Sequence, residues 1–484
     1  MKLMLIRPPL EFGRGWDVAA QAEIPLALMY LGAACRRAGH NVVLFDAAVQ
    51  AEPSDLAFND AGILHVGASW EEVARTVREA APDVVGINSA FYTQMPQALH
   101  TARVVRSVLE NVPILVGGPP VTVRPEDYLA EPAVTVAALG EAEVTLPQLL
   151  ERFASGRPLD GIPGIAYRRD GRMTVNERIG FLEDLDALPD PAYDLVDLER
   201  YMRTASMDTA GHWRWRPHRT MTVLTSRGCP FHCMYCAVHC HMGRKYRMQS
   251  AERALGHIRF IATELGIREL HFIDDNMNQN RDRFNAILDG LIAMKREGMP
   301  IAWETPIGMR TDKLTYDLLA KAKEAGCRAI FLTIESGSQR VLDKVINKGL
   351  QLDSVLRAAE ACHRLGLKAR AGFIMGLPGE TLADMRMTID LAHTLKRRYG
   401  IRGHVSMATP LYGTRLYDVC VEKGYLKQEM TPENVARSFE EAGMIETEDW
   451  TIAELRARRN AMRLQDSWLH RAVRKIRRAI AGRK

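Results

Sequence analysis

The sequence predicts an α/β protein: a doubly wound N-terminal domain, then a partial (β/α)6 barrel, then a helical C-terminal segment. Two observations support this. Short apolar runs alternate with amphipathic helical patterns over residues 3–154, and a second series of six such units begins near residue 220. Buried apolar strands that alternate with helices form parallel sheets with helices on their faces. At 484 residues the chain is long enough for two or three domains with separate cores.

The first series predicts five strands and their intervening helices. The strands are expected at 3–6, 42–45, 84–87, 113–116 and 134–138, and the helices at 24–38, 70–80, 98–109 and up to 154. In doubly wound sheets, ligands bind beyond the carboxyl ends of the strands. Small or turn-forming residues follow those ends here, namely Pro8, Pro9, Ser89, Gly117, Gly118 and Gly140, with Glu141. Such residues at successive strand ends let a large ligand approach the backbone.

Residues 151–216 are expected to form a connector, because this stretch is rich in Asp and Pro and lacks long periodicity. Barrel strands are then expected at 222–225, 269–273, 301–304, 329–334, 371–375 and 405–408. Six consecutive βα units suit a partial barrel with its active site at the carboxyl ends of the strands. We therefore expect domains at 1–150 and 217–426, joined by the connector, and a helical segment at 427–484 with a basic tail.

The composition and the cysteine content indicate the type of protein and its expected cellular compartment. The chain has 47% hydrophobic and 25% charged residues, which is typical of soluble proteins, and neither a signal peptide nor a membrane span is expected. Eight cysteines, three of them closely spaced, favour metal binding in a reducing compartment over a disulfide framework. The cytoplasm is therefore the expected location.

The positive charge is concentrated in the tail. Of a net +5, seven basic residues and no acidic one lie between Ser467 and Lys484, so we expect no nucleic-acid partner for the body of the protein. Apolar residues form one stripe along this tail, at Leu469, Val473, Ile476 and Ile480. The pattern fits either an ordinary solvated helix or a helix lying on an anionic membrane surface, at the inner face of the membrane.

Three cysteines directly after the first barrel strand are the strongest chemical signal. Cys229, Cys233 and Cys236 have the spacing C-x3-C-x2-C, and thiolates are the usual ligands of iron–sulfur clusters. Three ligands rather than four leave one iron open for a further ligand. The alternative is a zinc site completed by Cys240 or a neighbouring histidine, although zinc motifs favour paired C-x2-C units.

This cysteine motif, with Tyr235 before the last cysteine, resembles the signature of the radical S-adenosylmethionine (SAM) superfamily. The resemblance extends over residues 222–426 and implies a 4Fe-4S cluster whose open iron binds SAM. It also implies cleavage of SAM to a 5′-deoxyadenosyl radical and an electron donor such as flavodoxin or ferredoxin. The SAM contacts it implies, besides Tyr235, are Asp274 and Asp275 for the amino group, Glu335 and Ser336 for the ribose or carboxylate, and Ile374 and Gly376 beside the adenine.

The N-terminal domain resembles the cobalamin-binding branch of that superfamily, which includes radical methyltransferases and the anaerobic cyclase of bacteriochlorophyll biosynthesis. The resemblance is carried by Pro8-Pro9, Gly117-Gly118, the Gly-Glu-Ala-Glu run at 140–143 and the segment 185–189. It implies cobalamin held by residues 1–150, through Pro8, Pro9, Ser89, Gly117, Gly118, Gly140 and Glu141. The D-x-H-x-x-G sequence that supplies a histidine to cobalt in many cobalamin proteins is absent, so we expect cobalt without a histidine ligand.

The two resemblances together imply an enzyme that methylates an unactivated carbon of a small or lipid-like metabolite. Radical cyclisation, ring rearrangement or oxygen insertion could use the same cofactors. A sulfur-inserting tRNA modifier shares the barrel but usually carries a second cysteine set, which is missing here. A zinc-stabilised cobalamin sensor is the non-enzymatic alternative. The sequence identifies neither a substrate nor a catalytic residue beyond the cofactor sites.

Overall fold

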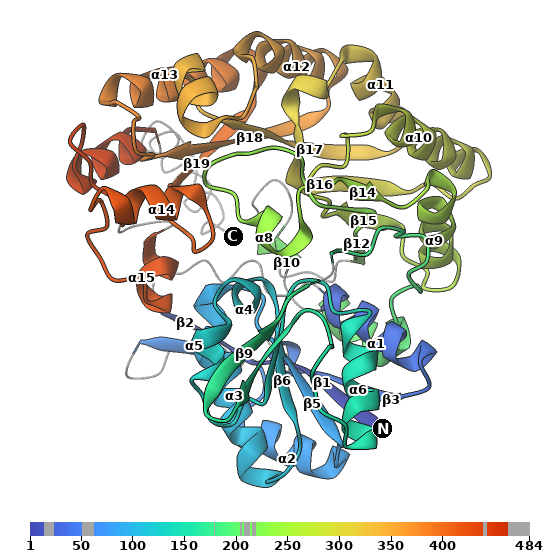
Figure 1. Cartoon of the computed structure of the whole chain (residues 1–484). Coiled ribbons are helices and arrows are strands. Elements are labelled where there is room, and N and C mark those ends of the chain that lie inside the picture. The colour runs from blue at the N-terminus through green and yellow to red at the C-terminus, as the bar shows by residue number, and fades with distance from the viewer. Residues whose placement is uncertain are drawn as a thin grey trace, which may run out of the picture.

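The computed structural model describes residues 1–13, 24–50, 62–178, 180–203, 206–207, 213–214, 219–438 and 443–462. The chain forms two α/β lobes, one above the other in Figure 1. The lower lobe holds the N-terminus and the upper lobe holds the barrel. The basic stretch 467–484, with its predicted amphipathic helix, lies outside the described residues.

The N-terminal lobe is built on a seven-stranded sheet. In spatial order its strands are β3 (Asn41–Asp46), β1 (Lys2–Arg7), β5 (Val84–Asn88), β6 (Ile114–Gly117), β7 (Val136–Ala138), β8 (Ile165–Arg169) and β9 (Arg172–Asn176). The first five are parallel, and β8 runs antiparallel to both of its neighbours, β7 and β9. The strand order reverses at β1, which lies between β3 and β5, and such a switch point is where doubly wound sheets bind ligands.

Helices cover both faces of this sheet because its strands are apolar on both sides. Met4 and Ile6 of β1 pack with α2 (Trp70–Ala80) and α3 (Met95–Val108). The alternate residues Leu3 and Leu5 pack with α1 (Leu26–Arg37) and α6 (Thr145–Ser155). Two short helices, α4 (Pro119–Val123) and α5 (Pro125–Leu129), follow β6. The doubly wound prediction is confirmed.

The sheet continues past residue 150, into the stretch predicted as a connector. Strands β8 and β9 form a hairpin whose two-residue turn, Asp170-Gly171, has positive φ at both positions. An Asp-Gly pair between two short strands is a strong hairpin signal. The two strands were nevertheless not predicted, because polar and basic residues make up much of their sequence. A separate two-stranded antiparallel sheet pairs β2 (Leu10–Gly13) with β4 (Ile63–Val66).

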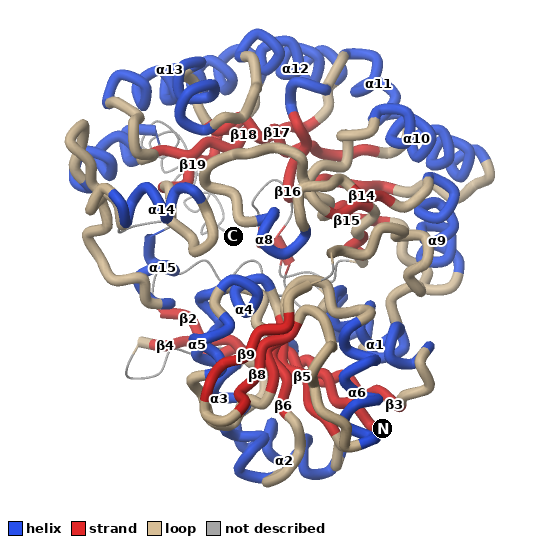
Figure 2. The backbone as a smooth tube through the Cα atoms, in the orientation of Figure 1, coloured by secondary structure: helices blue, strands red, loops and turns tan. Residues whose placement is uncertain are grey.

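The upper lobe is a partial barrel with six parallel strands in sequential order, as predicted. They are β12 (Thr220–Val223), β15 (Glu269–Phe272), β16 (Ala302–Arg310), β17 (Cys327–Glu335), β18 (Lys368–Met375) and β19 (Arg402–Met407). The helices on the outside, seen as the outer arc in Figure 2, are α9 (Ala251–Thr263), α10 (Arg281–Arg296), α11 (Tyr316–Glu324), α12 (Leu352–Leu365) and α13 (Leu382–Tyr399). Strand β16 extends beyond the predicted range 301–304. Its second half was not predicted because Pro306 and Gly308 interrupt the apolar pattern, and this half pairs with β17 in a shifted register.

Short elements connect the lobes and close the barrel. They are α7 (Leu198–Arg203), β10 (Ser206–Met207), β11 (Trp213–Arg214), β13 (Ser226–Arg227), α8 (Val238–Met242), β14 (Arg247–Met248), α14 (Arg415–Glu422) and α15 (Pro432–Arg437). Beyond α15, Trp450, Leu455 and Met462 join the core of the barrel. Within the described ranges, no helix is both long and apolar enough to cross a membrane.

Candidate active site

The carboxyl end of the N-terminal sheet lies against the cysteine loop of the barrel. Helix α4, directly after β6, packs against α8, directly after Cys236. The loop after β19 lies against both helices. A Cβ atom on Gly413 of this loop would lie 2.8 Å from Sγ of Cys240 in α8 and 3.0 Å from Cγ1 of Val123 in α4. The two edges at which the sequence predicts cofactors therefore face each other (Figure 1).

The three motif cysteines share one loop between β13 and α8. All three are reduced and partly exposed. The Cys236 amide donates to the Cys233 carbonyl (3.1 Å), and the Cys229 amide donates to the Gly243 carbonyl (3.3 Å), which closes the base of the loop. Burial raises the pKa of Cys233 and raises that of Cys236 to about 12. Thiolates are therefore favoured here only when a bound cation supplies positive charge.

The zinc alternative finds no support in the side-chain arrangement. Among the described side chains, no three His, Cys, Asp or Glu residues lie close enough to hold one metal ion. Cys240 instead donates to the Gly413 carbonyl (3.4 Å), and His239 Nδ1 bonds to the Cys236 carbonyl (3.1 Å). A four-iron cluster binds three cysteines through three different irons, so it does not require the thiolates to meet at one ion.

Two adjacent aspartates after β15 have different surroundings. The carboxylate of Asp274 is fully buried and accepts hydrogen bonds from the Thr225 amide (3.2 Å), the Thr225 hydroxyl (2.7 Å) and the Ser226 hydroxyl. It therefore fixes the corner that leads into the cysteine loop. Asp275 Oδ2 is buried without a hydrogen-bond partner among the described residues, and burial raises the Asp275 pKa to about 6.

Asn276, which the sequence-based site did not include, completes this group. Its Nδ2 lies 3.9 Å from Cys229 Sγ, and its buried Oδ1 has no hydrogen-bond partner within the described part of the chain. Two unsatisfied oxygen acceptors beside Cys229 suit an ammonium group, which offers three donors. Asp275 and Asn276, rather than Asp274, could therefore accept hydrogen bonds from the amino group of SAM.

Glu335 closes β17 with a buried ion pair. Its carboxylate accepts from Lys348 Nζ (2.9 Å), and its backbone has an unusual φ of 78°. Burial and the Glu335 charge raise the pKa of Tyr235, so its phenol keeps its proton. Ser336, by contrast, is fully buried and engaged with the Thr388 hydroxyl (3.3 Å) and the Ser338 amide (3.1 Å). Lys348 lies in a polar stretch that gave no sign of burial in the sequence.

A cavity of about 280 Å³ opens between β17, β18 and β19 beside the cysteine loop. Its walls bring together three predicted residues, Tyr235, Glu335 and Ile374, and are otherwise mainly apolar. Gly376 does not line it. The Gly376 amide instead donates to Glu380 Oε2 (2.7 Å), and its φ of 91° and the nearby Leu455 side chain require glycine at this position. Walls of this kind suit the flat face of an aromatic ring, such as that of an adenine base.

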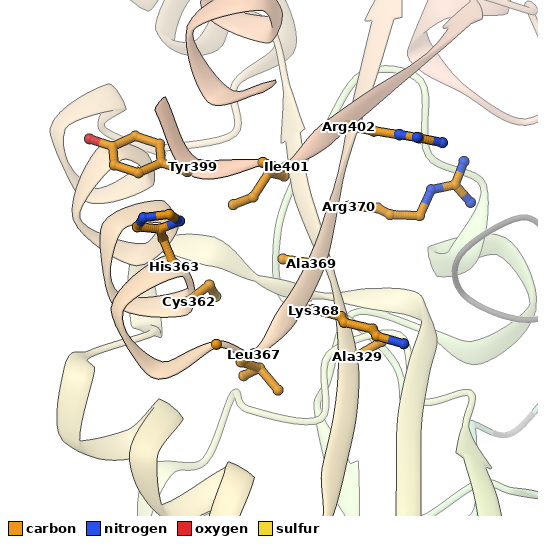
Figure 3. A pocket seen from close by; sticks show the side chains of 12 residues that line it. Ala329, Cys362, His363, Leu367, Lys368, Ala369, Arg370, Tyr399, Ile401 and Arg402 are labelled. Atoms are coloured by element: carbon orange, nitrogen blue, oxygen red, sulfur yellow. The ribbon is translucent and has the colours of Figure 1, made fainter. Parts of the chain in front are cut away.

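A larger cavity of about 380 Å³ lies at the opposite end of the barrel, where β18 and β19 begin (Figure 3). Lys368, Arg370 and Arg402 line it, together with the ends of α12 and α13 at His363 and Tyr399. It contains none of the predicted site residues. Because barrel active sites lie at the carboxyl ends of the strands, we place the chemistry at the smaller cavity.

In the N-terminal lobe, the predicted residues form a closely packed edge. The Ser89 hydroxyl bonds to Tyr128 (2.8 Å), and a Cβ atom on Gly118 would lie 1.9 Å from the Ser89 carbonyl oxygen. Pro8 and Pro9 are buried at the end of β1. A Cβ atom on Gly117 would make only an ordinary van der Waals contact, 3.7 Å from Ala138 Cβ. The Gly140 amide donates to Thr122 Oγ1 (2.7 Å). These residues shape the edge through their backbone, and the Ser89 hydroxyl is already engaged.

Glu141 has a partner from the barrel. Both of its carboxylate oxygens accept from Arg247 (2.7 and 2.8 Å), and its Oε2 also accepts from the Leu182 amide (3.1 Å). The carboxylate is therefore engaged between the lobes, and a contact from Glu141 to cobalamin would have to come from its backbone.

Two apolar side chains at the same edge are exposed. Phe91 and Val144, which follow β5 and β7, are 58% and 52% exposed, and both are available to contact a ligand bound there. The three histidines of residues 1–150 lie elsewhere. His65 bonds to Glu11 and to the Ala68 carbonyl, His100 stacks on Trp70, and His40 precedes β3. None follows a strand end of this edge.

Comparisons with known proteins agree with both lobes. Residues 223–392 match the radical SAM superfamily, and residues 17–150 match the B12 binding domain. The chain is 31% identical over 428 residues to an uncharacterized methyltransferase of Pyrococcus horikoshii, covering 88% of this chain and 84% of that protein. It is 27% identical to the cytidylyl-2-hydroxyethylphosphonate methyltransferase of Streptomyces wedmorensis, covering 95% and 89%.

A solved structure shares the whole fold. The radical SAM methyltransferase TsrM of Kitasatospora setae, with cobalamin and a [4Fe-4S] cluster bound, superposes with a TM-score of 0.68 at 16% identity. The match covers 92% of this chain and 86% of that one.

Proposed function

Because the chain belongs to the cobalamin-dependent radical SAM methyltransferase family, we propose that it methylates an unactivated carbon of a small or lipid-like metabolite. The observation that carries this proposal is the facing arrangement of the two cofactor edges. Helix α4 of the N-terminal lobe packs against α8, beside the cysteine loop of the barrel. A carbon held between these edges could be activated from one side and receive a methyl group from the other.

The enzyme uses a 4Fe-4S cluster, SAM and cobalamin. When bound, these groups supply a radical that removes hydrogen from carbon and a methyl group carried on cobalt. The chain contributes binding and orientation. In our proposal Cys229, Cys233 and Cys236 hold the cluster, and Asp275 and Asn276 receive the amino group of SAM. The apolar cavity beside Tyr235 and Ile374 holds the nucleoside and excludes water.

The two relatives described above support methylation over cyclisation, since both carry methyltransferase names. We propose a small-molecule substrate and an electron donor of the flavodoxin or ferredoxin type, with no nucleic-acid partner. We also propose the cytoplasm as location, with the basic tail as a peripheral contact to the membrane.

Anaerobic reconstitution followed by product analysis tests the proposal. With methyl-deuterated SAM and candidate metabolites, methylation yields one S-adenosylhomocysteine and one 5′-deoxyadenosine per labelled product. Deoxyadenosine without homocysteine product or label transfer would refute methylation and support the cyclisation alternative.

Paired cysteine variants test the cluster assignment in the same assay. Cys236→Ala should lose the iron–sulfur chromophore and the cleavage of SAM. The matched control, Cys240→Ala, should keep both, because the Cys240 thiol bonds to the Gly413 carbonyl and to His239. Loss of the cluster from the Cys240 variant would contradict the ligand assignment.

A further inference from the structure

Four charged side chains are buried together where the two lobes meet. Glu141 and Glu143 come from the loop after β7, and Arg227 and Arg247 come from the barrel. Arg227 pairs with Glu143 (2.6 Å) and with Glu141 (3.4 Å), and Arg247 pairs with Glu141 (2.7 Å). None of the four side chains is more than 10% exposed. Ion pairs this deeply buried have fixed geometry, because each charge needs its partner to offset lost hydration.

The two arginines belong to the support of the cysteine loop. They lie opposite each other on the antiparallel ribbon of β13 and β14, in register. Arg227 precedes Cys229 by two residues, and the intervening Gly228 has a φ of 83° and no room for a side chain, since its Cβ would lie 2.3 Å from the Lys245 carbonyl oxygen. A displacement of Arg227 is therefore transmitted to the first cysteine.

The carboxylates belong to the predicted cobalamin edge. Glu141 and Glu143 flank Ala142, directly after Gly140 and directly before the exposed Val144. The Arg227 guanidinium, a group that keeps its charge in proteins, pairs with both carboxylates. Its charge also lies over the ring of Tyr30 from α1, at 5.6 Å. The network thus joins the predicted cobalamin edge to the cysteine loop through three ion pairs.

We propose that Glu141 and Glu143 are positioning residues that set the separation of the cobalamin edge from the cysteine loop through Arg247 and Arg227. This inference rests on the proposed function, because it concerns the distance between the two cofactors. Other contacts join the same regions, such as the ion pair of Glu183 with Lys245, but both of those side chains are more than 60% exposed. An exposed pair of flexible side chains is screened by water and does not fix a distance.

Magnetic coupling between the cofactors measures that distance. The full-length protein, reconstituted with the iron–sulfur cluster and cob(II)alamin, is reduced by one electron at the cluster while the cobalt stays Co(II). It then contains two paramagnets whose dipolar interaction is read by pulsed electron paramagnetic resonance. Glu143→Gln keeps the shape of the side chain but removes its charge. We expect it to retain both cofactors, and to broaden the distance distribution or shift its mean by about 1 Å, a displacement that matters for a positioned reaction. The matched control, Glu183→Gln, should give the wild-type distribution.

A second variant controls for the possibility that Glu143→Gln misfolds because it leaves a charge unpaired. Arg227→Met combined with Glu143→Leu removes both charges, so no unpaired charge remains buried from that pair, and it should also alter the distribution. Wild-type distributions in both the Glu143→Gln and the double variant would overturn the inference. If iron and corrinoid analysis showed that the wild-type protein retains only one of the two cofactors, the proposed function would fail, and the inference with it. The two failures are therefore distinguishable.

Discussion

The carboxyl group of Glu380 offers a sharp test of the loop that follows β18. Glu380 is fully buried, and its Oε2 accepts from the amides of Gly376 (2.7 Å) and Leu377 (3.2 Å). Its Oε1 has no hydrogen-bond partner among the described residues. Burial raises the pKa of Glu380 from 4.5 to about 7. Glu380→Gln keeps an oxygen acceptor for the two amides and removes the charge.

The raised pKa determines the sign of the pH dependence. Because the folded protein holds the proton more tightly than the unfolded chain does, the stabilisation is fully present below pH 4.5. It is lost as the pH rises to about 7. The gap between these pKa values corresponds to roughly 3 kcal/mol of the free energy of unfolding. Glutamine cannot ionise, so the variant should differ from the wild type by less than about 1 kcal/mol at pH 5 and exceed its stability by up to roughly 3 kcal/mol at pH 8.

Urea unfolding of the full chain at pH 5 and pH 8, followed by circular dichroism, measures this difference. Glu380→Ala is the control, since it loses both hydrogen bonds and leaves a cavity, and it should be less stable than the wild type at both pH values. A glutamine variant no more stable than the wild type at pH 8 would refute the reasoning. It would show that the carboxylate is ionised in the fold without a penalty.

Three further predictions concern the cofactors and the tail. Asp275→Asn should weaken SAM binding in equilibrium dialysis by about tenfold or more while the iron content stays normal, because one charge-assisted hydrogen bond is lost; unchanged affinity would remove Asp275 from the site. Protein loaded with cobalamin should show a base-off absorption spectrum without histidine coordination, and failure to retain any corrinoid through gel filtration would count against the N-terminal assignment. If the tail binds anionic membranes, the full chain should float with anionic liposomes and a form ending at Gln465 should not. Equal flotation of the two forms would contradict membrane binding by the tail.

The fold was largely predictable because its strands are apolar on both faces. Runs such as 84–87 can be buried only in a sheet covered on both sides, and the helices between them have clear periodicity. Strands β8 and β9 were not predicted, because an antiparallel edge hairpin with basic residues has no apolar run to detect. The second half of β16 was missed for a related reason, since Pro306 and Gly308 interrupt its pattern.

The candidate site was predictable where chemistry fixes the residue type. Three cysteines at close spacing indicate a metal centre even when the fold is not known. Lys348 and Arg227 carry no such signal, because a lysine or arginine in a polar stretch is normally exposed. Only the fold brings each of them to a buried carboxylate, at Glu335 and at Glu143.

Asp274 and Asp275 show why residue type alone cannot separate a ligand from a support. Both carboxylates follow the same strand, and a family motif includes both. In the structure one of them accepts three hydrogen bonds from the corner before the cysteine loop, whereas the other keeps a buried oxygen without a partner in the described chain. A buried acceptor left unsatisfied is costly, so such a group persists when a ligand satisfies it. The same reasoning makes Glu141, whose carboxylate is saturated by Arg247 and Leu182, a support.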